Sequence, residues 1–160
     1  MNTFHITHRV HHHAEDMYEL VASVDDYPKF VPLCHDLRVR SREQRGDLEI
    51  LIADMSVAYK FIQETFASRV TLDPQSSQIL VEYLDGPFRH MENRWQFKKV
   101  DEGVCDVDFF IAYEFRSRAL QLLMGTLFDK AFRKFVDAFE ARADVVYGTT
   151  GERPASPATA

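Results

Sequence analysis

The chain has 160 residues, of which 46% are hydrophobic, and it carries a formal net charge of -6 at pH 7. This length suits one domain with a sizeable core, and the apolar content excludes wholesale disorder. Proteins that bind nucleic acids rely mainly on lysine and arginine to neutralise phosphates, so the acidic charge argues against a general polyanion binder and predicts no binding to DNA.

The sequence carries no signal for membrane insertion or export. No apolar run approaches the roughly 20 residues of a membrane span, and the start MNTFHITHRV has neither a secretory nor a transit-peptide pattern. We therefore expect a bacterial cytoplasmic protein, with a transient peripheral contact at the inner membrane as a further expectation. Cys34 and Cys105 form neither a disulfide framework nor a metal-ligand spacing, so both are predicted to be reduced thiols, and Cys34 is expected to be buried.

The N-terminal third begins with a strand and a short helix in the prediction. Apolar and polar residues alternate from Phe4 to Val10, which is typical of a half-buried strand. Three adjacent histidines follow, at residues 11–13, but adjacent side chains do not converge on one ion as histidines at i and i+4 would, so we expect a solvated loop and no metal site. Helical spacing from Ala14 to Val24 predicts an amphipathic helix.

The middle of the chain predicts an antiparallel meander. Two prolines in residues 25–34, DDYPKFVPLC, prevent a regular helix and predict a compact apolar connector. Turn signals then separate six candidate strands, and alternation is lost at Ile52 and Ala53, which predicts a β-bulge there. The predicted strands span residues 37–42, 48–61, 65–72, 78–84, 88–99 and 104–115.

Alternation in the last two strands indicates which side chains share the core face. The odd-numbered residues from Val107 to Phe115 and from Met91 to Phe97 form this face, which places Asn93 among apolar groups. An unpaired buried polar group costs about 1 to 3 kcal/mol. Asn93 should therefore donate to a ligand carbonyl or be satisfied by a neighbouring side chain or water.

Residues Arg118 to Tyr147 predict one long helix, with Ser117 as the N-cap and Gly148 after its C-terminus. Its apolar arc is roughly 200°, which is wider than the stripe of about 100° that covers an ordinary core. The helix can be a plain core-covering element or one wall of a cavity. Residues 149–160 have no apolar period, so we expect one domain over residues 1–148 and a disordered tail over residues 149–160.

Together these elements predict an α+β fold in which a curved antiparallel sheet wraps around the long helix. A curved sheet and a rod-like helix cannot touch everywhere, so we expect an elongated apolar pocket between them. Five short segments are similar to one known family: residues 27–34 (YPKFVPLC), 68–70 (SRV), 86–88 (GPF), 95–97 (WQF) and 138–143 (AFEARA). With the order of elements, they resemble the START-like, helix-grip superfamily, and in particular its coenzyme-Q-binding branch, which also includes ribosome-association toxin proteins.

The resemblance implies a non-enzymatic protein that binds ubiquinone or another polyprenyl lipid in a hydrophobic tunnel. It would act as a quinone chaperone or carrier that supports respiration or quinone biosynthesis, with ubiquinone as a bound ligand and no other cofactor. One alternative is a toxin-like protein that binds the large ribosomal subunit and blocks subunit association, with Arg38, Arg40, Arg42, Arg45 and Lys60 as a basic patch. A second alternative is a polyketide cyclase or aromatase, although the chain carries no nucleophile, phosphate-binding or zinc motif.

The expected binding site combines both walls of the pocket with its mouth. The head group should be held near residues 27–34 and 86–88, which are the candidate gate because prolines and Gly86 punctuate them. Gly125 is a candidate hinge in the long helix, since glycine costs about 1 kcal/mol relative to alanine inside a helix. The predicted ligand-binding residues are Phe30, Val31, Phe88, Met91, Asn93, Trp95, Phe109, Ile111, Tyr113, Leu123, Leu127, Phe128, Ala131 and Phe135.

Overall fold

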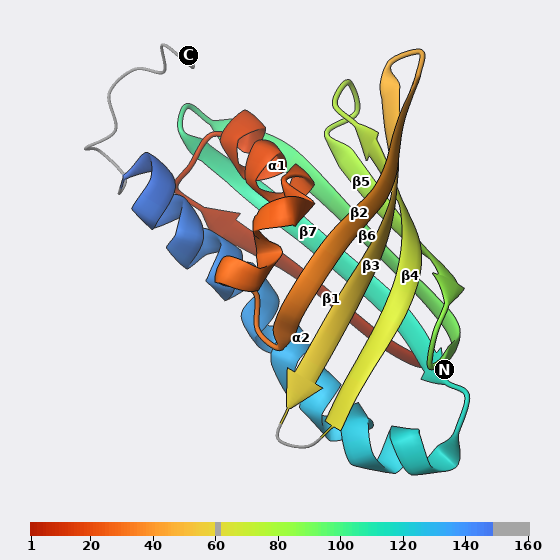
Figure 1. The fold of residues 1–160 in the computed structure, drawn as a ribbon. Helices are drawn as coiled ribbons and strands as arrows, with labels where there is room; N and C mark the ends of the chain where they lie inside the picture. Colours follow the sequence, from red (N-terminus) through yellow and green to blue (C-terminus); the bar gives the residue numbers. More distant parts are fainter. Residues whose placement is uncertain (60–61, 149–160) are drawn as a thin grey trace.

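The computed structural model describes residues 1–59 and 62–148. Its strands and α-helices follow the predicted order, and the connector predicted without a regular helix begins with a short 3-10 helix (Figure 1). The predicted tail, residues 149–160, and the end of the predicted strand 48–61 lie outside the described residues. The elements are β1 (Asn2–Val10), α1 (Ala14–Ala22), the 3-10 helix η1 (Val24–Lys29), β2 (Cys34–Arg45), β3 (Leu48–Tyr59), β4 (Ile62–Asp73), β5 (Gln78–Asp85), β6 (Phe88–Asp101), β7 (Val104–Phe115) and α2 (Arg118–Tyr147).

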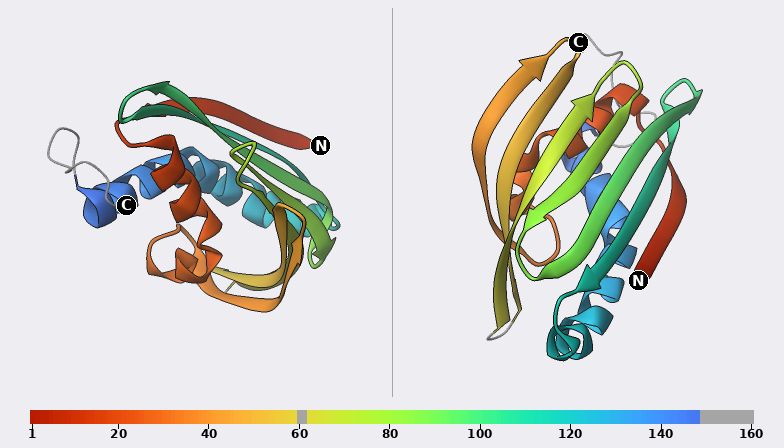
Figure 2. Two further views of the ribbon diagram at one scale, coloured as in Figure 1. Left: turned by 90° about the horizontal axis from the view of Figure 1, so that it is seen from above. Right: turned by 90° about the vertical axis from the view of Figure 1, so that its right-hand side faces the viewer.

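The strands form one seven-stranded antiparallel sheet with the order β1-β7-β6-β5-β4-β3-β2. Consecutive strands from β2 to β7 are neighbours, as expected for a meander, and β1 pairs with β7 at one edge. The sheet curls around α2, which lies along its concave side (Figure 2). Helix α1 packs on the same side against α2, β6 and β7, and η1 packs against β2 at the other edge. This arrangement is the α+β helix-grip fold that the sequence predicted.

The core lies between α2 and the strands at one edge of the sheet. The odd-numbered residues of β7 face inward, and Val107, Phe109 and Tyr113 are at most 3% exposed. Helix α2 packs against α1, β7 and β1 and makes no comparable contact with β2 to β5. The far half of the concave face is therefore open to side chains from η1 and the loop that follows it.

The predicted bulge lies in a different strand. Strand β3 pairs with β4 without a register shift, so Ile52 and Ala53 are not bulged. The shift occurs across the ladder in β2, between Val39 and Ser41, at the level of the same two residues. Ile52 is apolar but lies half-buried on the outer face of β3. Its apolar side chain interrupts the apolar–polar alternation of the sequence although the strand itself is regular.

The ends of α2 are capped as predicted. The Ser117 hydroxyl accepts a hydrogen bond from the Leu120 backbone N–H at 3.2 Å, and Gly148 follows the helix with a φ of 87°. Helix α2 continues without interruption through Gly125, where an added Cβ would meet only the flexible amide of Gln121. A hinge at Gly125 remains a prediction.

The C-terminal half of α2 is fastened to the start of the chain by two histidine-carboxylate pairs. His8 Nε2 lies 2.8 Å from Glu140 Oε1, and His12 Nε2 lies 2.7 Å from Asp144 Oδ1. The His12 side chain is only 3% exposed, whereas Asp144 is 45% exposed. These contacts hold α2 over the concave face.

Asp144→Ala is expected to lower the free energy of unfolding by about 1 to 3 kcal/mol, because it leaves the buried His12 ring nitrogen without its partner. Urea denaturation followed by circular dichroism measures the loss. Asp137→Ala is the matched control, since Asp137 is on the same helix, 69% exposed and 3.8 Å from His8. Equal effects of the two substitutions would contradict the assigned role of the His12–Asp144 pair.

Candidate functional site

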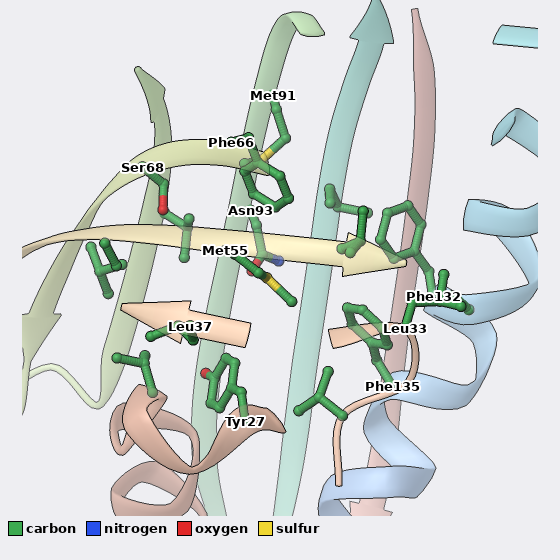
Figure 3. A pocket seen from close by; sticks show the side chains of 18 of the residues that line it. Tyr27, Leu33, Leu37, Met55, Phe66, Ser68, Met91, Asn93, Phe132 and Phe135 are labelled. Atoms are coloured by element: carbon green, nitrogen blue, oxygen red, sulfur yellow. The ribbon is translucent and has the colours of Figure 1, made fainter. Parts of the chain in front are cut away.

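An apolar cavity of about 110 Å³ lies between α2, the η1 region and the concave face of the sheet (Figure 3). It occupies the part of the concave face that α2 leaves uncovered. Side chains from strands, helix and loop converge on it because alternate strand residues point to one face and helix residues repeat every three or four positions. The lining residues are Val24, Tyr27, Val31, Pro32, Leu33, Leu37, Ala53, Met55, Val57, Phe66, Ser68, Val70, Ile79, Val81, Phe88, Met91, Asn93, Trp95, Ile111, Phe128, Ala131, Phe132, Phe135 and Phe139.

The described lining is almost wholly apolar and carries no charged side chain. Only Tyr27, Ser68, Asn93 and the Trp95 indole contribute polar side-chain atoms. Burial of apolar surface is worth about 25 cal/mol per Å². The cavity is therefore suited to hold a hydrophobic molecule with few polar atoms.

The Asn93 amide is satisfied largely by the protein. Its Nδ2 donates to the Phe110 carbonyl at 2.8 Å, and its Oδ1 accepts from the Trp95 indole N–H at 2.8 Å. This network fixes the orientation of Trp95 in the cavity wall. An amide nitrogen has two hydrogens, so Asn93 keeps one donor beyond the bond to Phe110.

Ser68 is the polar residue whose position in the cavity the sequence analysis missed. It is only 5% exposed and lines the cavity from β4, and no described residue forms a hydrogen bond with its hydroxyl. Figure 3 places its oxygen on the cavity side of the strand. The signal was available, because Ser68 alternates in phase with Phe66 and Val70 in the predicted strand.

Tyr27 is a structural element of the cavity wall. Burial raises the pKa of its phenol far above the ordinary value, and its hydroxyl donates to the Val21 carbonyl. The ring packs edge-on against Phe139, with ring centroids 5.4 Å apart. Tyr27 is therefore neutral and held in place.

Nine of the fourteen predicted binding residues line the cavity. Phe30, Phe109 and Tyr113 lie behind this lining and support it: Phe30 packs on Phe139 at 5.0 Å between ring centroids, and Phe109 on Trp95 at 4.7 Å. The nine are Val31, Phe88, Met91, Asn93, Trp95, Ile111, Phe128, Ala131 and Phe135.

Leu123 and Leu127 were placed in the cavity wall by the helical pattern, and the structure puts them outside it. Leu123 is 59% exposed, and Leu127 is half-buried and not part of the lining. The apolar arc of α2 is broad because it includes side chains that face outward in the first turns of the helix. The pattern alone does not distinguish these from the side chains that face the sheet.

The two stretches expected as a gate differ in how firmly they are held. At Gly86 the φ is 139°, and an added Cβ would lie 2.7 Å from the Phe66 Cβ. The Phe88 N–H donates to the Tyr83 hydroxyl at 3.1 Å, so residues 86–88 are tightly packed. Leu33, by contrast, has a left-handed φ of 68°, a conformation that is strained for leucine. The loop before β2 is therefore the better candidate for a moving segment.

Cys34 is buried, as predicted, and Cys105 is buried as well. Burial, reinforced by nearby Asp36, raises the pKa of the Cys34 thiol to about 11, and burial raises that of Cys105 to about 12. The folded state thus favours the neutral thiols. Their contribution to stability is present below the ordinary thiol pKa and is lost as the pH rises toward 11 to 12.

Iodoacetamide at pH 8 is expected to modify the native protein about 100-fold more slowly than the urea-unfolded chain, because the thiolate is the reacting form. The native rate should climb as the pH approaches 11, where Cys34 ionises. Mass spectrometry of timed samples measures both rates. A native thiol that reacts as fast as the unfolded one would contradict the assigned environment.

One cluster has the donor types of a metal site. His8, Asp137 and Glu140 bring one ligand atom each within 4.8 Å of one another. The His8–Glu140 hydrogen bond accounts for this geometry, and Asp137 is 69% exposed. The cluster could accept a divalent cation, but it lies apart from the residues that line the cavity.

A curved antiparallel sheet that grips a long C-terminal helix around an apolar cavity defines a START-like protein. A family model described as "Polyketide cyclase / dehydrase and lipid transport" matches residues 10–140. The chain belongs to this family, which confirms the resemblance.

Several relatives are also similar over most of the chain. The ribosome association toxin RatA of Vibrio cholerae is 33% identical over 84% of this chain and 90% of its own length. The mitochondrial coenzyme Q-binding protein COQ10 homolog B of Xenopus laevis is 31% identical over 84% of this chain, which matches 54% of that protein.

Solved structures agree with the fold. An 18 kDa protein of Caulobacter crescentus has a TM-score of 0.77 and 32% identity, with 93% of this chain and 100% of that chain covered. A START superfamily protein of Mycobacterium smegmatis has a TM-score of 0.75 at 17% identity, with 90% and 98% covered, and supports the fold alone.

Proposed function

We propose that this protein binds ubiquinone, or a related polyprenyl lipid, in the cavity and carries it as a chaperone in support of respiration or quinone biosynthesis. The observation that carries the proposal is the uncharged apolar cavity with isolated polar groups at Ser68 and Asn93. The similarity to a coenzyme Q-binding protein points to the same ligand class. The role is binding rather than catalysis, because the described lining offers no acid-base pair.

The size of the cavity indicates which part of the lipid it holds. A dry cavity of about 150 Å³ accepts benzene, so 110 Å³ is space for part of a ring-sized group rather than a whole polyprenyl chain. We infer that the quinone ring enters the cavity and that the wall yields around it. The strained backbone at Leu33 favours a movement of this loop, and α2 packs less closely on β2 to β5 than on α1, β1 and β7.

Ubiquinone analogues with short tails test the proposal. Trp95 is the single tryptophan of the chain and lines the cavity, so a bound quinone should quench its fluorescence. Saturable quenching at micromolar concentrations is expected. A linear, non-saturating decrease that matches free tryptophan would argue against a quinone in the cavity.

Ser68→Ala is expected to weaken quinone binding about fivefold to tenfold, which corresponds to the loss of one neutral hydrogen bond. The free protein should keep its thermal stability, because the hydroxyl has no partner to lose within residues 1–59 and 62–148. Trp95 quenching measures the affinity. Ser56→Ala is the control, since Ser56 bonds Thr65 at the outer surface of the sheet at 2.8 Å. Unchanged affinity in Ser68→Ala would remove Ser68 from the binding site.

A second candidate function is binding to the large ribosomal subunit, with a block of subunit association. It is favoured by the similarity to ribosome association toxins over most of both chains. The predicted basic patch gives it less support, because Arg40 pairs with Asp54 at 3.1 Å and Arg42 with Asp25 at 2.6 Å. Lys60 lies outside the described residues. Sucrose-gradient sedimentation decides this function, which requires a fraction of the protein to travel with the large subunit.

Within this proposal the protein works in the cytoplasm and meets its lipid at the membrane surface. No helix in the described part of the chain is long and apolar enough to cross a bilayer. Transfer of a lipid would then depend on a transient, peripheral contact.

A further inference from the structure

The largest exposed apolar side chains of α2 lie in its first turns. Leu122 is 82% exposed and Leu123 is 59% exposed, although a leucine is usually buried. Both belong to the outward side of the helix, with Ala119 and Thr126 as exposed neighbours at helical spacing. The first turns of α2 thus present an apolar face to the surroundings.

The topology brings two further exposed apolar side chains to the same end of the molecule. Strands β3, β5 and β7 all finish at this end, and α2 starts directly after β7 (Figures 1 and 2). Tyr59 ends β3 and is 41% exposed, and Leu84 is the residue before the last one of β5 and is 45% exposed. We call the exposed face of α2 formed by Leu122 and Leu123, with Ala119 and Thr126 beside them, the α2-start surface.

The charges near the α2-start surface differ from those of the whole chain. Residues 115–128 contain Arg116 and Arg118 but no acidic residue, although the net charge of the protein is -6. Acidic side chains stabilise the first turn of a helix, and α2 has none there. Glu114 is paired with Arg89 at 3.2 Å, which leaves Asp85 as the acid of the adjacent β5–β6 turn. Helix stability does not explain an apolar, cationic helix start.

The α2-start surface lies near the cavity along the axis of α2, on a different side of the helix. Phe128 is the first cavity-lining residue of the helix, about one and a half turns after Leu123. Phe88, at the start of β6, lines the cavity from the same end and packs on Phe128 with ring centroids 6.0 Å apart. A molecule that meets the α2-start surface is thus close to the cavity wall.

We propose that the α2-start surface docks on a lipid bilayer that carries anionic headgroups, with Leu122 and Leu123 inserted at the headgroup boundary and Arg118 directed to the lipid phosphates. Exposed leucines beside arginines are the pattern of an interfacial helix, whose apolar face sinks a few ångströms into the membrane surface. Anionic lipid adds attraction for each nearby arginine. This docking rests on the proposed function, in which a lipid carrier must contact the membrane. Vesicle binding does not require a quinone, so it can be tested separately from quinone binding.

Sedimentation with sucrose-loaded vesicles, free of quinone, tests the docking. The wild-type protein is expected to bind vesicles of phosphatidylglycerol and phosphatidylcholine at least about fivefold more tightly than vesicles of phosphatidylcholine alone. Leu122→Ser/Leu123→Ser should reduce binding to the mixed vesicles by about 30-fold or more, because two apolar side chains no longer insert. Val145→Ser/Val146→Ser is the matched control, since these residues are 75% and 49% exposed near the other end of α2.

Three results would overturn the proposal: no sedimentation of the wild type, equal binding by the leucine variant, or an equal loss in the valine control. The α2-start surface would belong to a ribosome contact instead if the wild type bound no vesicles but sedimented with large ribosomal subunits, and the leucine variant lost this sedimentation. Trp95 quenching by a water-soluble quinone analogue should be unchanged in the leucine variant. This measurement separates a failure of docking from a failure of quinone binding.

Discussion

Ala131→Phe is expected to lower the affinity for ubiquinone analogues by about 100-fold or more, because the new ring occupies the site of the ligand. Ala131 is 7% exposed and lines the cavity from α2. A benzene ring fits a cavity of about 150 Å³, so a phenyl group fills most of the 110 Å³ present here. Titration by Trp95 quenching gives the affinity.

The matched control is Ala141→Phe, which places the same ring on an exposed position of the same helix. It should bind the analogues as the wild type does. Overpacking costs about 1 to 3 kcal/mol, so thermal melts must accompany the titrations of Ala131→Phe. Ala53→Leu, which fills the cavity from β3 with a smaller group, serves if the first variant is poorly folded. Wild-type affinity in a folded cavity-filling variant would place the ligand elsewhere.

Phe139→Ala is expected to lower the free energy of unfolding by about 3 to 5 kcal/mol, the usual cost of removing a buried aromatic ring. Phe139 is 1% exposed and joins three parts of the structure. Its ring centroid lies 5.4, 5.0 and 5.1 Å from those of Tyr27, Phe30 and Trp95, which belong to η1, the following loop and β6. The loss therefore loosens the contact between α2 and both cavity walls.

Urea denaturation followed by circular dichroism measures this effect without relying on Trp95, whose emission the substitution would change. Phe110→Ala is the control, because Phe110 is half-buried on the outer face of β7. A loss of less than about 1.5 kcal/mol would be typical of an easily repacked site. Such a result for Phe139→Ala would contradict its role as the link between helix and sheet.

The fold was predictable because its local signals agree with its global arrangement. Alternation in β7 identified the buried side chains, and Ser117 and Gly148 marked the ends of α2. The bulge was the exception. Its position depends on the pairing of β2 with β3. The sequence around Arg40, the unpaired residue of β2, contains no signal for a bulge.

The lining residues of the candidate site were predictable on the strands, where alternation gives the inner face. They were less predictable on α2, where the angle between helix and sheet determines which side chains reach the cavity. Met91 and Trp95 line the cavity as the period-2 pattern predicts, whereas Leu123 does not. A helix pattern gives the apolar arc but not the angle at which the helix meets a curved sheet. The position of Ser68 in the cavity was not predicted, because a single serine in a strand is ordinary until packing shows that its hydroxyl has no partner among the described residues.

Extraction of the protein after purification from a quinone-producing bacterium, followed by mass spectrometry of the extract, tests the central claim most directly. We expect ubiquinone, or another polyprenyl quinone of the host, in the wild-type extract, a strong depletion in Ala131→Phe and no change in Ala141→Phe. The claim would be contradicted by an extract without quinone or other polyprenyl lipid, together with the absence of any thermal shift or Trp95 quenching on addition of quinone.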